Sequence, residues 1–240
     1  MIGSPRLMKA TVSLIAVVLL GAVLAAVLLA QRGDWVGRLK EALGISTYLA
    51  PPDAAATDHR RRRLASFRAD SAQADIVLLG DSHIENGDWV SLLTGRIVLN
   101  RGIGWDTTQD VLDRLDEVIA RKPRMVLIQI GIVDLRYGRD PATVSRNIQG
   151  IAGRLREAGI RPYVHSVLSV AARLRETTNE RVRAVNDALR ADPDFLDLHP
   201  ILVTDGALQP ALTTDGVHLS GPAYALWARR LAGVLDSSSQ

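Results

Sequence analysis

The chain contains no cysteine and few aromatic residues, and both shortages exclude classes of function. Without cysteine among its 240 residues, it has no disulfides, no thiolate metal ligands and no cysteine nucleophile. Only 4% of the residues are aromatic, and the net charge of +3 is unevenly spread. Residues 1–63 carry nine Lys/Arg against four Asp/Glu, so the rest of the chain has a net charge of −2. A nucleic-acid-binding domain would carry its basic excess on the folded part, interleaved with aromatic residues, so we expect no nucleic-acid partner.

Glycine and proline are also too few for a disordered or repetitive chain. There are 19 glycines and 10 prolines, while 47% of the residues are hydrophobic and 23% are charged. This composition is that of a chain with a packed core. The length allows one ordinary domain with an additional segment.

The apolar residues are concentrated near the N-terminus. Between Thr11 and Ala30, 17 of 20 positions are apolar and none is charged. Twenty helical residues cover about 30 Å, the thickness of the hydrocarbon layer. A cleaved signal peptide is the competing interpretation, but Leu28 stands where the first small residue of the cleavage site should be. We therefore predict an uncleaved transmembrane signal-anchor helix over residues 11–31, after a short leader over residues 1–10.

The segments around this span set the predicted domain organisation. Basic residues flank the span on both sides, so the positive-inside rule does not fix its orientation. A short leader with the main domain on the far side is the usual bacterial signal-anchor arrangement, and it predicts a single-pass inner-membrane protein with a periplasmic domain. Residues 32–56 are expected to be a tether and residues 57–240 the domain. The basic run His59–Arg63 is interpreted as the solvated face of a leading helix rather than a lipid-headgroup patch. A homodimer stays an alternative, because small residues form a ridge along the span at Ala22, Ala26 and Ala30.

Beyond the tether, short apolar runs alternate with amphipathic stretches. Strands are expected over Asp75–Leu79, Arg96–Leu99, Met125–Ile130, Pro162–Leu168 and Asp194–Leu198. Helices are expected around Trp89 and over Thr108–Arg121, Pro141–Ala158, Thr178–Arg190 and Pro222–Leu235. The alternation predicts an α/β fold with a parallel sheet and helices on both faces. In such sheets, ligands bind beyond the carboxyl ends of the strands.

Small and polar residues follow these expected strands. Gly80, Asp81, Ser82 and His83 follow the first strand, residues 100–104 the second and residues 131–134 the third. Asp215 and His218 precede the last helix. A serine, a histidine and an aspartate are the residue types of a nucleophile, its base and the group that orients the base.

These four blocks, in this order, resemble those of the SGNH, or GDSL, hydrolase family over roughly Ala74 to Leu235. The second block, Asn100-Arg101-Gly102-Ile103-Gly104, is similar to the branch that contains platelet-activating-factor acetylhydrolase subunits and bacterial lysophospholipases. The resemblance implies a three-layer flavodoxin-like fold and hydrolysis of esters or amides, with no cofactor. No metal is implied, because no cluster of histidines and carboxylates has ligand spacing. The Gly-x-Ser-x-Gly motif, which carries the nucleophile in α/β-hydrolases, is absent, so the sequence does not favour the α/β-hydrolase fold.

The same resemblance assigns roles to individual residues. Ser82 would be the nucleophile, His218 its base and Asp215 the group that holds the imidazole tautomer. Alone, each has a simpler interpretation as a turn-capping or helix-capping residue. The backbone amides of Ser82 and Gly102 would stabilise the oxyanion. The other matching positions are expected to support the motif, with Asp134 bracing the neighbouring loops: Gly80, Asp81, Asn100, Gly104, Gly131 and Asp134.

One position departs from the family pattern. The family's third oxyanion donor is an asparagine side chain, and Val133 occupies its place. Valine cannot donate a hydrogen bond, and the loss of one such donor typically costs about 10² to 10³ in rate. The sequence does not choose among the side chains that could replace it, which are Gln129, Asn100 and Asn147.

Three functions therefore stay open. The first is a membrane-anchored serine esterase acting on a small-acyl, lipid or glycan ester. The second is an acyltransferase to a glycan or lipid acceptor, and the third is a binding protein that keeps the fold but has lost turnover. The predicted anchor places the domain beside a membrane, which favours lipid or envelope-glycan esters over cytosolic metabolites.

Overall fold

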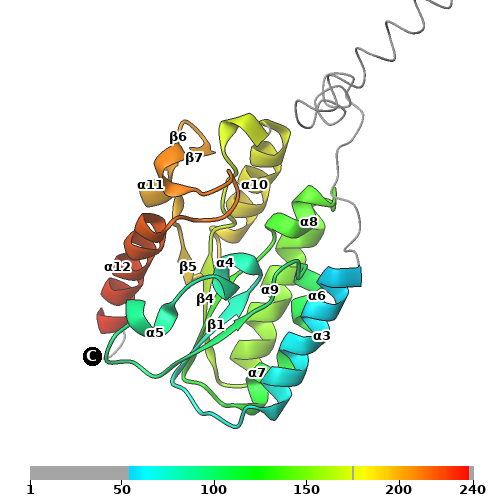
Figure 1. Ribbon diagram of the computed structural model, residues 1–240, viewed down its shortest axis with the longest axis vertical. Coiled ribbons are helices and arrows are strands. Elements are labelled where there is room, and N and C mark those ends of the chain that lie inside the picture. Colours follow the sequence, from blue (N-terminus) through cyan, green and yellow to red (C-terminus); the bar gives the residue numbers. More distant parts are fainter. Residues whose placement is uncertain (1–53, 175, 238–240) are drawn as a thin grey trace, which may run out of the picture. The chain divides into compact units, whose positions relative to one another are not determined.

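Five parallel strands form the central sheet of this computed structural model (Figure 1), in which the described residues are 54–174 and 176–237. The predicted leader, the transmembrane segment over residues 11–31 and the tether up to residue 53 lie outside the described residues. Within those ranges, no helix combines the length and the apolar character needed to cross a bilayer.

The strand order is β2-β1-β3-β4-β5, which is the flavodoxin-like order of a doubly wound sheet. The strands are β1 (Ile76–Gly80), β2 (Val98–Gly102), β3 (Met125–Gln129), β4 (Arg161–His165) and β5 (Phe195–Leu196). All four pairings are parallel. The predicted α/β class and the parallel sheet are therefore confirmed.

All five strands differ from their predicted bounds by at least one residue, and the fifth is only two residues long, Phe195–Leu196. The second strand extends to Gly102, because Gly102 pairs with Gly80 at the end of β1. The fourth ends at His165 rather than Leu168. Its ladder stops there because the Val167 N–H donates to the side chain of Asn186 instead of to a neighbouring strand.

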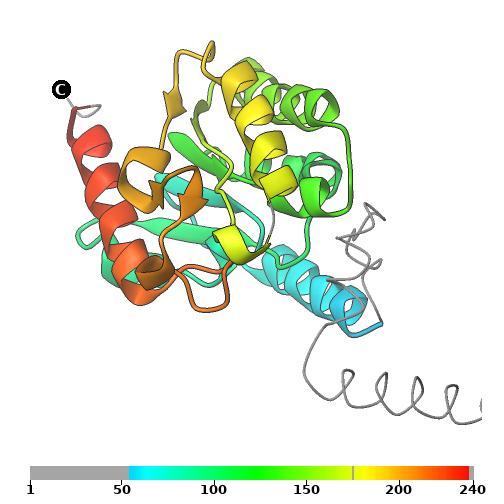
Figure 2. The same cartoon turned by 90° about the horizontal axis from the view of Figure 1, so that it is seen from above.

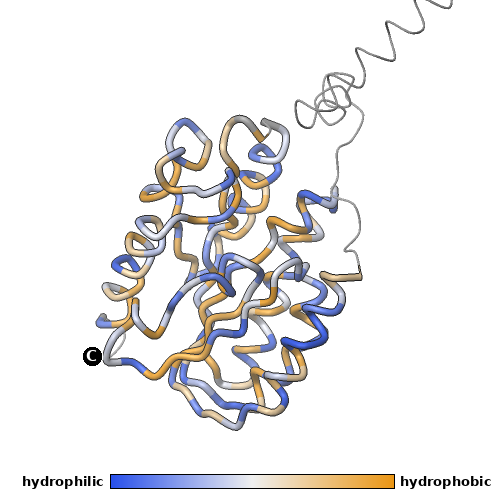
Figure 3. Tube along the Cα trace, in the orientation of Figure 1, coloured by the Kyte–Doolittle hydropathy of each residue, from blue (hydrophilic) through white to orange (hydrophobic). Residues whose placement is uncertain are grey.

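Helices cover both faces of the sheet. Alternate strand residues point to opposite faces, so Val77 and Leu79 lie in one apolar cluster while Ile76 and Leu78 lie in the other. The first face is covered by α6 (Thr108–Asp113), α7 (Leu115–Ala120), α9 (Pro141–Glu157) and α10 (Glu176–Leu189). The second is covered by α5 (Trp89–Leu92), α11 (His199–Leu202) and α12 (Gly221–Ser237). Figure 2 shows the two helical layers with the sheet between them, and the strands carry much of the hydrophobic colour in Figure 3.

Several elements differ from the sequence expectations. The stretch predicted as one helix over Thr108–Arg121 is two helices, α6 and α7, with a break at Arg114 (φ −113, ψ 8). The Arg114 guanidinium turns inward and donates to the carbonyl oxygens of Gly80 and Arg101. Sequence periodicity did not indicate α4 (Ser82–Glu85), α8 (Ile132–Arg136) or the hairpin of β6 (Val203–Thr204) and β7 (Ala207–Leu208).

The N-terminal helix of the described domain, α3 (Ala54–Ala69), corrects two expectations. It begins at Ala54, so the last three residues of the predicted tether are helical. The basic run His59–Arg63 is not a uniformly solvated face. The Arg61 and Arg62 side chains are 80% and 67% exposed, whereas Arg60 and Arg63 turn toward the domain and pair with its carboxylates.

Candidate active site

Ser82 lies at the carboxyl end of β1, where the strand turns into α4. Strands β1 and β3 approach each other closely just before this turn. A Cβ at Gly80 would lie 1.9 Å from the carbonyl oxygen of Gln129, so only glycine fits at this position. Asp81 then caps α4, with its Oδ1 accepting a hydrogen bond from the His83 N–H at 2.9 Å. Ser82 follows as the first residue of this helix. The local sequence thus presents the serine at the edge of the sheet where ligands bind in this class of fold.

The serine hydroxyl, the histidine and the aspartate form a continuous chain of hydrogen bonds. Ser82 Oγ lies 3.1 Å from His218 Nε2, and His218 Nδ1 lies 2.6 Å from Asp215 Oδ2. An ionised carboxylate only accepts, so Nδ1–H donates to Asp215, which leaves Nε2 to accept the Ser82 proton. The structure therefore brings together three residues that lie up to 136 positions apart in the chain.

A tight loop before α12 holds Asp215 and His218 in this arrangement. Gly216 has a φ of +96, a conformation that favours glycine. The Thr213 hydroxyl accepts from the Gly216 N–H at 2.8 Å and donates to the His218 carbonyl at 2.7 Å. Thr213 also pairs with Leu219 in a short antiparallel bridge. The loop is thereby closed on both sides of the two candidate residues.

Asp215 is ionised at neutral pH. Its Oδ1 accepts from the backbone N–H groups of Val217 and His218, both at 2.8 Å. Partial burial raises the pKa of Asp215, but the hydrogen bonds from the His218 ring and from these two amides outweigh it and hold the pKa well below its usual range. The negative charge that would stabilise an imidazolium at His218 is therefore in place.

His83, although next to the serine in sequence, is engaged elsewhere. Its ring is buried, Nε2 lies 2.9 Å from the Val217 carbonyl, and Nδ1 lies 3.3 Å from Asp81 Oδ1. Burial lowers the pKa of His83, but Asp81, the Val217 carbonyl and the charge of Asp215 together raise it above its usual value. His83 therefore supports the loop that carries His218.

The loop after β2 corrects one expectation about the oxyanion donors. The Gly102 N–H already donates to the Asn100 side chain at 2.9 Å. The next two amides are also engaged, because Ile103 donates to the Gly80 carbonyl and Gly104 donates to Glu85 Oε2 at 2.5 Å. Across 102–106, within the described residues, the Trp105 N–H is the one amide without an acceptor.

Trp105 is a residue that sequence reasoning missed. It follows Gly104, where an added Cβ would lie 3.8 Å from Ser82 Cβ, so this loop runs beside the serine. Trp105 has a φ of +72 and its side chain is 46% exposed. A left-handed backbone at a non-glycine residue is uncommon and clusters at functional sites. A tryptophan gives no sequence signal for such a conformation, which only the fold imposes.

Val133 and the three amide side chains that could replace the missing asparagine are all buried or engaged in hydrogen bonds. Val133 is 6% exposed and packs in an apolar cluster. Asn100 Nδ2 donates to the Ile84 and Glu85 carbonyls, and Asn147 Nδ2 donates to Thr108 Oγ1, so both are engaged. Gln129 is fully buried, and its side-chain nitrogen and oxygen have no hydrogen-bond partner among the described residues.

Asp134 links helix α8 to the start of helix α6. Its two carboxylate oxygens accept from the backbone N–H and the hydroxyl of Thr108, both at 2.8 Å. Burial raises the pKa of Asp134, against the lowering effect of these hydrogen bonds. The carboxylate thus ties the start of α6 to α8, and it does not reach the Ser82 hydroxyl. Among the described side chains, no three His, Asp or Glu residues converge as metal ligands.

Comparison with known proteins finds related sequences and folds. Residues 78–226 match the GDSL-like Lipase/Acylhydrolase family. The human platelet-activating factor acetylhydrolase IB subunit alpha1 is 31% identical over 186 residues, which span 70% of this chain and 79% of that protein. Esterase TesA from Pseudomonas aeruginosa is 28% identical over 155 residues, or 61% of this chain and 75% of the esterase. A GDSL-like lipase from Bacteroides thetaiotaomicron shares the fold, with a TM-score of 0.64 and 21% identity over 74% of this chain and 97% of that structure.

Proposed function

We propose that this chain, which belongs to the GDSL-like lipase/acylhydrolase family and is an enzyme acting on ester bonds, does so through Ser82, His218 and Asp215. The observation that carries the proposal is the chain of hydrogen bonds from Ser82 Oγ to His218 and on to Asp215, at 3.1 and 2.6 Å. Both distances suit direct proton transfer and orientation of the base.

The reaction follows from the positions of these groups. Ser82 Oγ attacks the ester carbonyl while His218 Nε2 takes the hydroxyl proton, and Asp215 stabilises the imidazolium that forms. The tetrahedral intermediate collapses when His218 returns the proton to the leaving alcohol, leaving an acyl group on Ser82. A water molecule, activated by His218, then attacks this acyl-enzyme and releases the acid.

The oxyanion would be stabilised by two backbone amides. Ser82 at the start of α4 and Trp105 in the loop after β2 each present an N–H group without an acceptor among the described residues, and this loop runs beside the serine. Trp105 takes the place that Gly102 was expected to fill, since the Gly102 amide is bound to Asn100. The donor missing at Val133 leaves this hole one hydrogen bond short of the family pattern, which predicts a modest turnover rate.

The substrate we favour is a short-chain acyl ester of a lipid or of an envelope glycan. The exposure of the site supports a large, surface-presented substrate rather than an enclosed metabolite. His218 and Asp215 have side chains that are 37% and 53% exposed, so the site is open to solvent. The platelet-activating factor acetylhydrolase similarity supports an ester with a small acyl group on a lipid.

Hydrolysis of p-nitrophenyl esters from acetate to palmitate tests the proposal on the purified full chain. We expect activity that is highest with the short acyl groups, and loss of at least about 10³-fold in Ser82→Ala and His218→Gln. Ser91→Ala, an exposed serine on the neighbouring α5, is the matched control and should retain the wild-type rate. Equal rates in wild type and Ser82→Ala would exclude the proposed nucleophile.

Residues 11–31 are proposed to anchor the enzyme in a bacterial inner membrane, with the domain on the periplasmic side. The support is the composition of the segment, which is apolar at 17 of the 20 positions from Thr11 to Ala30 and contains no charge. This placement would keep the active site close to lipid and envelope-glycan esters.

A further inference from the structure

Helix α3 docks on the domain through charged side chains rather than through an apolar face. Phe67 is its one buried residue among the described positions, and it is covered by the guanidinium groups of Arg63 and Arg101 at 4.8 and 4.6 Å from the ring centre. Arg121 fixes the end of the helix, since its Nη2 donates to the carbonyls of Phe67 and Asp70, both at 2.7 Å. Two arginines of α3, Arg60 and Arg63, contact the loop after β2, and Arg60 also reaches Asp110 of α6.

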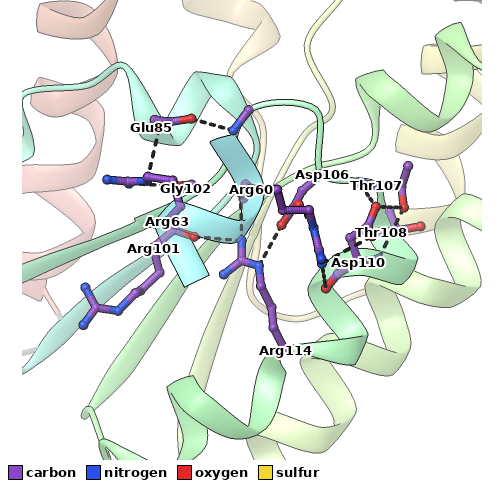
Figure 4. Close-up of polar contacts among 12 residues, drawn as sticks. Arg60, Arg63, Glu85, Arg101, Gly102, Asp106, Thr107, Thr108, Asp110 and Arg114 are labelled. Carbon is purple, nitrogen blue, oxygen red and sulfur yellow. Dashed lines mark hydrogen bonds and ion pairs between the residues drawn. The ribbon is translucent and has the colours of Figure 1, made fainter. Parts of the chain in front are cut away.

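Arg63 and His59 hold the carboxylate of Glu85, which in turn holds the loop after β2. Figure 4 shows Arg63, Glu85 and Gly102 of this network. Glu85 Oε1 lies 3.1 Å from Arg63 Nε and 2.9 Å from His59 Nε2. The other oxygen, Oε2, accepts from the Gly104 N–H at 2.5 Å. Arg63 also donates directly to the Gly102 carbonyl at 2.8 Å. One arginine of α3 therefore fixes this loop at two points, one of them through Glu85.

Arg60 fixes the far end of the same loop. Its Nε donates to Asp106 Oδ1 at 2.8 Å, while Arg114 Nε donates to Asp106 Oδ2 at 2.7 Å. Asp106 is fully buried, and a buried carboxylate requires such paired charges. Arg114 also donates to the Gly80 carbonyl, two residues before Ser82. The ends of β1 and β2 are thus tied to each other and to α3.

Trp105 lies between these two attachments. On one side, the Gly104 N–H donates to Glu85, which pairs with Arg63 of α3; on the other, the Asp106 carboxylate accepts from Arg60 of α3. The Trp105 backbone itself is in the left-handed region, at φ +72. An unusual backbone conformation persists only where the surrounding structure fixes it. The conformation of the Gly104–Trp105 peptide therefore depends on the two attachments.

We propose that Arg63 and Glu85 are positioning residues for the reaction, which set the Gly104–Trp105 peptide as an oxyanion donor and so couple helix α3 to catalysis. The inference rests on the proposed function, because the donor matters only if Ser82 attacks an ester. It adds a role for a segment that precedes the family match, which begins at residue 78. Neither residue touches the substrate, and both act through the amide of Trp105.

The test compares Arg63→Gln with Arg62→Gln in the purified full chain. Arg62 is the matched control, since it lies on the same helix, is 67% exposed and pairs only with Asp58 among the described side chains. Three quantities are measured with p-nitrophenyl acetate: kcat, KM, and the Ki of an aryl trifluoromethyl ketone. The ketone forms a tetrahedral oxyanion adduct with a serine nucleophile, so its Ki reports on the oxyanion donors in a way that a general loss of stability does not.

For Arg63→Gln we expect kcat to fall about tenfold and the ketone Ki to rise by a similar factor, while KM changes less than about twofold. Arg63→Lys keeps the charge and should recover part of both effects; it also carries the comparison if Arg63→Gln fails to fold. Arg62→Gln should match wild type. An unchanged ketone Ki in Arg63→Gln and Arg63→Lys, or an equal rise in Arg62→Gln, would overturn the inference while leaving the esterase proposal intact. A wild-type chain without esterase activity would remove the proposed function and this inference together.

Discussion

At the scale of single residues, Val133 is the position where this chain departs from the family pattern. It is buried among apolar side chains in α8, where the family pattern has an amide donor. The candidates to replace that donor are either bound to other groups, as Asn100 and Asn147 are, or fully buried, as Gln129 is. The oxyanion would then rely on backbone amides.

Val133→Asn should raise kcat by about tenfold, because it adds a third donor beside the proposed nucleophile and base. The same change should lower the free energy of unfolding by roughly 1 to 3 kcal/mol, since a polar amide replaces a buried valine. Steady-state kinetics and urea unfolding of the variant measure both effects. If the variant folds and its kcat is unchanged, the missing side chain at position 133 is not what limits stabilisation of the oxyanion.

The residues of the site differ in how well the sequence predicts them. Ser82, His218 and Asp215 stand out because motif spacing places them at strand ends and on one loop, and the structure brings their side chains together. The loop after β2 was less predictable. The sequence favoured Gly102, but its amide is used by Asn100, and the free amide belongs to Trp105. Which amide of a loop stays free depends on local turn geometry, which residue types alone do not fix.

At the scale of elements, β4 carries a buried histidine that links folding to pH. His165 is 1% exposed, packs edge-on against Trp227, and has no hydrogen-bond partner for its ring nitrogens among the described residues. Burial lowers the pKa of His165 to about 3. An unfolded histidine has a pKa of about 6.5, so between these values the unfolded chain binds a proton that the folded chain does not.

This difference predicts that stability falls as the pH drops below about 6.5 and continues to fall toward about 3. The His165 contribution amounts to about 1.4 kcal/mol per pH unit in that window. His165→Phe, which keeps an aromatic ring beside Trp227, should remove it and flatten the dependence of the unfolding free energy on pH between 6 and 4. Urea unfolding of both proteins at several pH values measures the slopes. Parallel slopes would show that His165 does not titrate in this way.

The helices and strands themselves were predicted well where periodicity was strong. The helix over Pro141–Ala158 and the strand from Met125 match their structural counterparts closely. The break at Arg114 was not predicted, because its cause is an arginine turned onto Asp106 and the Gly80 carbonyl. The docking of α3 was likewise hidden. Its ion pairs join residues 26 and 46 positions apart, a distance at which sequence patterns carry no pairing information.

At the scale of the whole molecule, the fold class follows from the alternation of strands and helices, and the strand order agrees with the flavodoxin-like resemblance. The remaining expectation concerns the N-terminal segment, which lies outside the described residues. Its long apolar run predicts attachment to a membrane. Because α3 begins at Ala54, only residues 32–53 separate the proposed anchor from the helix that contacts the loop after β2.

The membrane proposal predicts that the full chain sediments with the inner membrane of bacterial cells and resists extraction with alkaline carbonate. Removal of residues 1–31 should release it into the soluble fraction, because the hydrophobic span supplies most of the binding free energy. Protease added to spheroplasts should digest the domain if it faces the periplasm. A full chain found in the soluble fraction would contradict the anchor, and protection from protease would reverse the proposed orientation.

The central claim is that Ser82 is an activated nucleophile, and covalent labelling tests it most directly. A fluorophosphonate probe reacts with serine hydroxyls that have a working base, so the wild-type chain should take up one probe per molecule. Mass spectrometry should place the probe on Ser82, and labelling should be lost in Ser82→Ala and much slower in His218→Gln. No labelling of the folded wild-type chain, or equal labelling of Ser82→Ala, would contradict the account.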